Sequence, residues 1–366
     1  MSWDETLDSS KIAWHSERLA AWDRGERIAP ITIDMALTRQ CNYACHFCYA
    51  SMQENERKPI TIPVMESFLS DCAEAGVRGI SLVSDGESSI HPAFDFTLLR
   101  GKALGIDMAV GTNGLLMTKA KAEKLLPALT YLRVNFSGGT RERYSEIMGA
   151  KPGWYDKVCQ NIRDMMEVKR RLGLTCTVGM QMVLDPRYAD QIIPLARLGK
   201  ELRPDYLVIK HCSDDIDGQL GVDYTKYAEL EEILHEAEGL SDESYHVVVK
   251  WTKIRAGNTR SYQRCYGPPF ILQISGSGLV APCGVMFNDR FRKFHIGSIV
   301  DERFKDILAS DRYWEVVRYL ASGEFDAQKS CGSLCLQHKT NEALDSRAKG
   351  VPFIKPLIEP MHASFI

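Results

Sequence analysis

Three cysteines stand within eight residues, in the run CNYACHFCYA, as Cys41, Cys45 and Cys48. Their C-x3-C-x2-C spacing puts three thiolates on one short loop, enough to bind three irons of a cubic [4Fe–4S] cluster. Such clusters are normally held by four Cys thiolates. A set of three therefore predicts either a distant fourth ligand or an iron left open to a small molecule. Zinc, which prefers paired C-x2-C hooks, and buried structural thiols are the alternatives.

A second group of four cysteines follows residue 250. Cys265 and Cys283 flank the run QISGSGLVAPC, a strand–turn–strand pattern with glycine at the turn, and Cys331 and Cys335 lie in KSCGSLCLQH. A hairpin pair and a loop pair predict a four-thiolate cage. Zinc would satisfy this cage equally well on ligand count.

The first motif resembles that of the radical SAM superfamily, in which C-x3-C-x-aromatic-C carries a [4Fe–4S] cluster and S-adenosylmethionine (SAM) chelates the open iron. Phe47 occupies the aromatic position, and the resemblance places its backbone against the adenine. It implies reductive cleavage of SAM to a 5′-deoxyadenosyl radical that abstracts a substrate hydrogen. The cofactor carries such chemistry, and the protein supplies position and exclusion of solvent.

The second group resembles the twitch subset of the SPASM extension of radical SAM enzymes. That subset carries one auxiliary [4Fe–4S] cluster, here ligated by all four cysteines. The full extension has seven cysteines and two clusters, and only the final C-x3-C of its characteristic run is present in this chain. The resemblance therefore implies a single auxiliary cluster that passes an electron.

The elements that must position these cysteines alternate between apolar β-branched runs and helical periodicity from residue 31 to about 210, which predicts βαβ units and a parallel sheet. Six units are too few for an eight-stranded barrel, so we expect an α/β fold with a partial (β/α)6 TIM-like barrel. A small C-terminal α+β domain of the twitch or SPASM type follows. The predicted strands are 31–37, 78–84, 106–112, 131–137, 174–183 and 205–210, and the predicted helices are 63–75, 93–104, 118–127, 154–172, 187–201 and 303–322.

Active sites of such barrels lie at the carboxyl ends of the strands, and small or polar residues follow each predicted strand here. SDGESSIHP (84–92) resembles the family's Gly-Gly-Glu-Pro motif, which binds the methionine amino group of SAM, although aspartate replaces the first glycine and serine the proline. A bare turn would have a similar composition. The predicted SAM contacts are Phe47, Asp85, Gly86, Glu87, Asn113, Ser137 and Gln181.

The loop after the sixth predicted strand supplies the candidate catalytic residues. Cys212 could return a hydrogen atom to a substrate radical, as a thiol does in radical SAM epimerases, or it could be a buried structural cysteine. His211 and Asp214 could accept a proton or grip a polar substrate, or they could cap a helix.

Composition and charge narrow the class of protein. Hydrophobic residues make up 45% of the 366, as in ordinary globular domains, and the net charge of −3 without a long basic run does not favour nucleic acid. The absence of a long apolar stretch or a signal peptide predicts a cytoplasmic protein without a membrane span. We expect an N-terminal helical extension (1–30), the barrel (31–245), and the auxiliary-cluster domain with its tail (246–366).

The resemblance implies a radical SAM enzyme that acts on a small hydroxylated or amino metabolite of the sugar or aminocyclitol type. Oxidation, elimination or epimerisation would follow, with an external electron donor such as flavodoxin or ferredoxin. Maturation of a ribosomal peptide is an alternative, although only about 30 residues precede the first predicted strand, too few for a module that grips a leader peptide. A non-catalytic iron–sulfur or zinc protein is a further alternative. We expect the C-terminal stretch VPFIKPLIEPMHASFI either to close the pocket or to strap the auxiliary domain.

Overall fold

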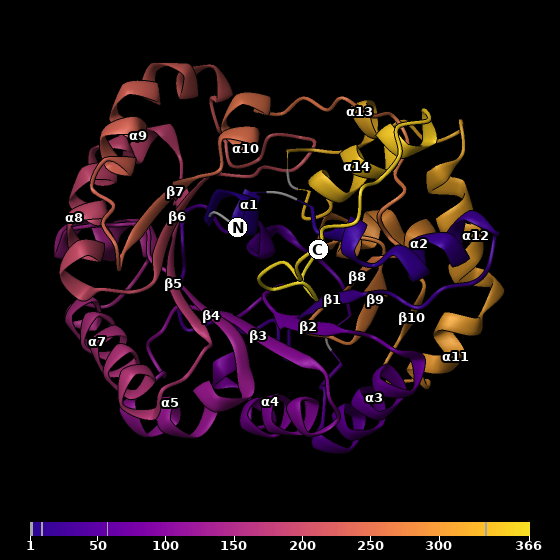
Figure 1. Cartoon of the computed structure of the whole chain (residues 1–366), viewed down its shortest axis with the longest axis horizontal. Coiled ribbons are helices and arrows are strands. Elements are labelled where there is room, and N and C mark those ends of the chain that lie inside the picture. Colours follow the sequence, from indigo (N-terminus) through magenta and orange to yellow (C-terminus); the bar gives the residue numbers. More distant parts are fainter. Residues whose placement is uncertain (1–2, 9, 57, 334) are drawn as a thin grey trace.

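A ten-stranded sheet organises the chain, with strand order β10-β9-β8-β1-β2-β3-β4-β5-β6-β7. The computed structural model describes residues 3–8, 10–56, 58–333 and 335–366. The strands curve into an open ring, and the helices from α3 to α9 lie on its outside (Figure 1).

All six predicted parallel strands are present, each paired with its neighbour in the chain. A seventh parallel strand, β7, pairs with β6 at the sheet edge. Sequence reasoning missed it because a long connection without β/α rhythm precedes the short run HVVV. The strands are β1 (Thr32–Met35), β2 (Gly79–Leu82), β3 (Asp107–Thr112), β4 (Leu129–Asn135), β5 (Thr177–Leu184), β6 (Tyr206–His211) and β7 (His246–Val249).

The outer helices bury one apolar stripe against the sheet. In the longest, α7, the buried Val158, Ile162 and Met165 recur at helical spacing. Thr61 caps α3 by accepting a hydrogen bond from Val64 N, and Gly76 ends the helix in the left-handed conformation that suits glycine. The helices are α3 (Ile62–Ala75), α4 (Phe94–Ala103), α5 (Lys119–Leu125), α6 (Arg141–Met148), α7 (Trp154–Leu172), α8 (Ile192–Leu202), α9 (Glu231–Glu238) and α10 (Trp251–Ala256).

The C-terminal part continues the same sheet. The predicted hairpin is present as β8 (Ile271–Ile274) and β9 (Leu279–Ala281), and β8 pairs parallel with β1, while β10 (Gly297–Ser298) adds a short antiparallel edge. The predicted helix 303–322 is divided at Ser310, whose hydroxyl caps the second half. The helices are α11 (Phe304–Ala309), α12 (Asp311–Ala321), α13 (Ala327–Ser330) and α14 (His338–Ala348).

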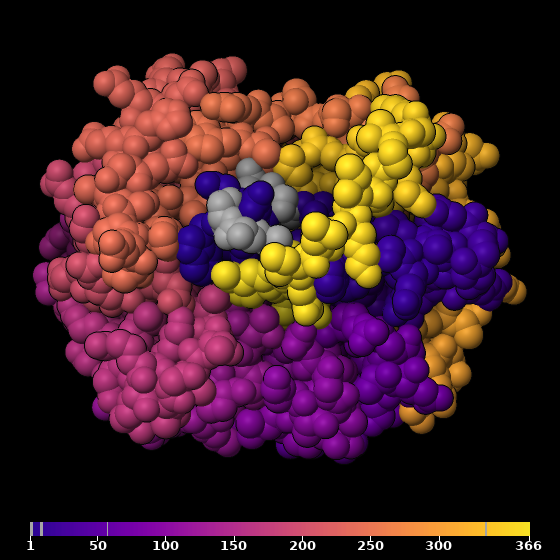
Figure 2. Space-filling view, in the orientation of Figure 1, coloured from indigo at the N-terminus to yellow at the C-terminus, as the bar shows by residue number. Residues whose placement is uncertain are grey.

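The two ends of the chain cover the face of the ring where the parallel strands begin. Thr32 Oγ1 donates to Ser364 O (2.8 Å), and Ser364 Oγ donates to Asp107 Oδ2 (2.7 Å), which ties the tail to the starts of β1 and β3. The ring of Trp3, in α1 (Trp3–Asp8), packs 5.1 Å from that of Tyr206 at the start of β6. Helix α2 (Ser16–Asp23) follows. Indigo N-terminal and yellow C-terminal residues lie next to one another near the centre of this face (Figure 2).

The last residues therefore form a floor beneath the barrel, opposite the strand ends that carry the cysteine loop. None of the helices in the described ranges is long and apolar enough to cross a membrane.

Candidate active site

The first cysteine loop follows β1 and is held by helix α6. His46 N donates to Ile147 O (3.0 Å), and the hydroxyls of Tyr43 and Tyr144 are 3.0 Å apart. A Cβ at Gly149, the residue that ends α6, would lie 2.4 Å from Ala44 O. Only glycine allows this close approach, so the loop and the helix end fit each other.

The three thiols of this loop lie close enough to influence one another electrostatically. Burial raises the pKa of Cys41 to about 11 and also raises those of Cys45 and Cys48, and neighbouring thiols reinforce the shifts of Cys41 and Cys45. The backbone N–H of Tyr43 donates to Cys41 Sγ (3.4 Å), as amides do around cluster sulfurs. Three grouped thiols that would lose their protons on binding metal fit a [4Fe–4S] cluster with one open iron.

The four cysteines of the second group also converge. Cys265 and Cys283 are each perturbed electrostatically by Cys331 and Cys335, and burial raises the pKa of Cys283 to about 12 and that of Cys331 to about 11. Asn341 Nδ2 donates to Cys265 Sγ (3.6 Å). These surroundings fit a fully ligated cluster.

Neither group is arranged around one metal ion. In the part of the chain that the structure describes, no set of three or more His, Cys, Asp or Glu side chains converges on a single ion. Cluster cysteines bind different irons, so their sulfurs need to stand apart from one another.

The β2 loop meets the root of the cysteine loop at Gly86. This residue has φ +73°, and a Cβ on it would lie 2.1 Å from Thr38 O and 2.8 Å from Gln40 O. The next residue, Glu87, donates its backbone N–H to Gln40 O (2.9 Å). Its carboxylate accepts from Thr112 Oγ1 and from Asn113 N, both at 2.7 Å. The ends of β1, β2 and β3 are thus joined around the cysteine loop.

The other predicted SAM contacts divide into two sets. Phe47, Gly86, Glu87, Asn113 and Gln181 line one chamber with the three cysteines of the first loop.

Asp85 and Ser137 do not line the chamber, and their side chains are hydrogen-bonded to other parts of the protein. The Asp85 carboxylate accepts from Ser275 Oγ and Gly276 N (both 2.7 Å), which ties β2 to the auxiliary hairpin. Ser137 Oγ accepts from Val183 N (3.1 Å) and is fully buried.

The chamber has a volume of about 740 Å³ and runs from the cysteine loop to the floor formed by the chain ends. Its wall includes three charged side chains: Asp34 on β1 and Arg133 on β4, which sequence reasoning did not select, and Lys210 on β6, which directly precedes the candidate catalytic residues His211 and Cys212 in the sequence. Asp34 and Arg133 are charged residues flanked on their strands by apolar ones, at alternate positions that face inward. That signal was available in the printed sequence.

Burial shifts the pKa of two of these side chains, Asp34 and Lys210. It raises the pKa of Asp34 to about 7, opposed by the charge of Arg133, and it lowers the pKa of Lys210 well below its usual range, reinforced by Lys253 and Arg133. A carboxyl with a pKa near 7 can accept or release a proton at neutral pH.

The predicted catalytic residues after β6 do not line this chamber. The Cys212 side chain is fully buried, and the ring of His211 is hydrogen-bonded through Nδ1 to Cys212 O (2.8 Å). Burial lowers the pKa of His211 to about 3 and raises that of Cys212 to about 12. Neither side chain belongs to the chamber wall.

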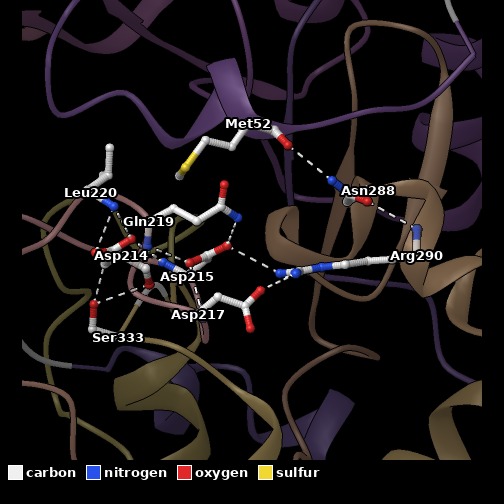
Figure 3. A network of polar contacts seen from close by, with 9 residues as sticks. All are labelled: Met52, Asp214, Asp215, Asp217, Gln219, Leu220, Asn288, Arg290 and Ser333. Carbon is white, nitrogen blue, oxygen red and sulfur yellow. Dashed lines mark hydrogen bonds and ion pairs between the residues drawn. The ribbon is translucent and has the colours of Figure 1, made fainter.

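Asp214 organises its own loop, as Figure 3 shows. Its carboxylate accepts from the backbone N–H of Leu220 (3.0 Å), and its own N–H donates to Ser333 Oγ (2.8 Å). Arg290 from the C-terminal part pairs with Asp215 (3.2 Å) and Asp217, so this loop is fixed to the auxiliary region.

Comparison with known protein families gives one match in the N-terminal half of the chain and one in the C-terminal half. Residues 35–193 match the radical SAM superfamily, and residues 265–336 match an iron–sulfur cluster-binding domain, SPASM. The first match carries a [4Fe–4S] cluster and SAM, and the second carries an auxiliary iron–sulfur cluster.

Two curated relatives come from Methanosarcina barkeri. The chain is 25% identical to an AdoMet-dependent heme synthase over 347 residues, covering 87% of this chain and 92% of the relative. It is 27% identical to an Fe-coproporphyrin III synthase over 151 residues, which cover 41% of this chain and only 37% of that relative. Among solved structures, SuiB of Streptococcus suis bound to its precursor peptide SuiA superposes with a TM-score of 0.63 at 17% identity, covering 87% of this chain and 73% of that one. At this level of identity, the likeness to SuiB shows a shared fold only.

Proposed function

This chain belongs to the radical SAM superfamily, and we propose that it acts on a small hydroxylated or amino-bearing metabolite bound inside the barrel. The observation that carries this proposal is the chamber of about 740 Å³ that joins the first cysteine loop to Asp34, Arg133 and Lys210. Sites for small molecules have volumes of about 300–1,000 Å³ and a few placed polar groups.

The bound cofactors would supply the 5′-deoxyadenosyl radical that abstracts a substrate hydrogen, and a centre that accepts an electron. The protein's own part is to hold the substrate and move a proton. Asp34 faces the chamber with a pKa of about 7 and is well suited to take the proton of a substrate hydroxyl once the adjacent carbon has lost its hydrogen. Loss of a hydrogen atom, a proton and an electron amounts to a two-electron oxidation.

Oxidation is favoured over epimerisation by the position of Cys212. A thiol that returns hydrogen to a substrate radical must reach it, and the Cys212 side chain is buried outside the chamber wall. Elimination of a neighbouring group would use the same chamber. An external donor such as flavodoxin or ferredoxin would reduce the first cluster in the cytoplasm.

Asn135, together with Gln181, which is also a predicted SAM contact, gives the chamber wall a polar edge. Gln181 Nε2 donates to Asn135 Oδ1 (2.8 Å), which leaves the Gln181 carbonyl and the Asn135 amide for a bound molecule. Both line the chamber, at neighbouring positions on β4 and β5. Such a paired amide edge suits a ligand with hydroxyl or amino groups.

The test is substrate-dependent turnover. The anaerobically reconstituted, reduced protein is incubated with SAM and either a panel of small hydroxylated and amino metabolites or a peptide fraction. We expect a small metabolite to increase 5′-deoxyadenosine formation and to lose two mass units. Stimulation by peptides alone would favour peptide maturation, and no 5′-deoxyadenosine under any condition would favour a non-catalytic protein.

A further inference from the structure

The wall of the chamber carries a large excess of positive charge. Among the described residues it includes seven Lys or Arg side chains but only two Asp or Glu side chains, Asp34 and Glu87. Glu87 is already engaged by Thr112 and Asn113. The seven cations are Lys11, Arg39, Arg133, Lys210, Lys250, Lys253 and Lys339.

Five of these cations have partners inside the protein. Lys11 donates to Phe365 O (3.1 Å), Arg39 pairs with Asp85 (3.3 Å), and Lys339 pairs with Glu342 (2.8 Å). Lys253 donates to Cys335 O (3.3 Å), beside the auxiliary cysteines, and Lys250 also has an interaction within the protein.

Arg133 and Lys210 differ from these five cations in their lack of a hydrogen-bond or ion-pair partner among the described residues. Within the described ranges, neither makes a hydrogen bond or ion pair, and Arg133 Nε is buried without an acceptor. The Arg133 guanidinium lies 5.9 Å from the ring centre of Tyr131, a weak cation–π contact. Asp34 acts on Arg133 only at long range, because no ion pair joins the two side chains.

An unpaired buried cation is unfavourable, and each hydrogen-bond donor that lacks an acceptor adds to the penalty. Both side chains line the same chamber, and the charge of Arg133 contributes to the lowered pKa of Lys210. Planar guanidinium donors match a carboxylate or phosphate in a bidentate geometry, and an ammonium beside them adds a point charge.

We propose that Arg133 and Lys210 form the binding site for an anionic group, a carboxylate or a phosphate, on the substrate. This rests on the proposed function, because it assigns a charge to the metabolite held in the same chamber. The anion would be contacted from two strands of the barrel wall, by Arg133 on β4 and Lys210 on β6, in the chamber that Asp34 on β1 also lines.

The carboxylate of SAM is the competing occupant. The predicted SAM contacts Glu87 and Asn113 lie at or beyond the carboxyl ends of β2 and β3. Arg133 lies two residues before the last residue of β4, about 7 Å deeper in the barrel at the usual rise of a strand. This depth assigns Arg133 to a molecule bound below the cofactor.

The test uses the reconstituted holoenzyme loaded with SAM, and calorimetric titration with inorganic phosphate and, separately, with succinate. We expect at least one of these anions to bind. Arg133→Gln should weaken that binding by about tenfold or more, and Lys210→Met by several-fold, as expected for charge-assisted hydrogen bonds. The matched control is Arg141→Gln, because Arg141 is an exposed arginine paired with Asp156 outside the chamber. It should bind anions like the wild type.

Arg133→Lys guards against a variant that fails to fold, because it keeps the charge and should retain part of the affinity. The proposal is overturned if neither anion binds the wild type, if Arg133→Gln binds as tightly as Arg141→Gln, or if Arg133→Gln instead weakens SAM binding tenfold. The two anions distinguish a phosphate from a carboxylate ligand. These titrations need no turnover, so failure of the proposed function, an absence of 5′-deoxyadenosine from the wild type, would be seen separately.

Discussion

Gly86 offers a sharp test of how the β2 loop supports the first cysteine loop. A Cβ at this position would lie 2.1 Å from Thr38 O and 2.8 Å from Gln40 O, and real Cβ atoms essentially never approach closer than 3.0 Å. Gly86→Ala therefore requires the two loops to separate by about 0.9 Å or more. Gly105 is a matched control, because its φ of +80° is similar but nothing lies within 4 Å of its Cβ position.

The expected magnitudes follow from these contacts. The left-handed backbone alone should destabilise either alanine variant by about 1–2 kcal/mol. Gly86→Ala should lose a further 1–2 kcal/mol or so, because separation of the loops also weakens the hydrogen bond from Glu87 N to Gln40 O (2.9 Å).

The assay is urea unfolding of the reduced, cluster-free proteins, followed by iron analysis after reconstitution. We expect Gly86→Ala to be less stable than Gly105→Ala and to bind about four irons per chain where wild type and Gly105→Ala bind about eight, since each cubane holds four. Equal stability of the two variants with equal iron content would refute the idea that this close approach supports the cluster loop.

Three further predictions concern other residues of the site. Replacement of Cys41, Cys45 and Cys48 by alanine should abolish 5′-deoxyadenosine formation and remove about four irons while the auxiliary irons remain; loss of all iron would contradict two separate clusters. The pKa of Asp34 is about 7 in the folded protein and ordinarily 3.8. Between these pH values the folded state therefore keeps a proton on Asp34 that the unfolded state has lost. The free energy of unfolding of the cluster-free wild type should therefore fall relative to that of Asp34→Asn as pH rises from about 4 to 7. If the urea midpoints of the two proteins change in parallel over this range, the prediction is wrong. Cys212→Ala should give the wild-type product, because this thiol lies outside the chamber wall; a product of altered stereochemistry or a stalled reaction would restore a hydrogen-donor role.

Local patterns were sufficient to predict most of the barrel. The bounds of α7 agree with the expected 154–172, because its apolar spacing and its flanking glycines are local signals. The pairing of β8 with β1 had no such signal, since it joins residues more than 230 positions apart. Strand β7 was missed because three valines without a following long helix carry little information about pairing.

Site residues were predictable where their position after a strand end places them in the chamber. They were less predictable where the side chain hydrogen-bonds to a residue far away in the sequence. Glu87 and Asn113 follow strand ends and line the chamber, and their contact with SAM stays a prediction. Asp85 occupies an equivalent position, but its carboxylate is engaged by Ser275 and Gly276 in the auxiliary hairpin, 190 residues away. No local pattern reveals that contact.

We propose that a radical formed at the first cysteine loop removes hydrogen from a small metabolite in the chamber. The most direct measurement uses candidate hydroxylated metabolites that carry a carboxylate or phosphate and deuterium at the carbinol carbon, with the reduced protein and SAM. We predict deuterium in 5′-deoxyadenosine and a metabolite oxidised by two electrons. Turnover of such a metabolite that leaves 5′-deoxyadenosine free of deuterium at every labelled position would rule out this hydrogen abstraction.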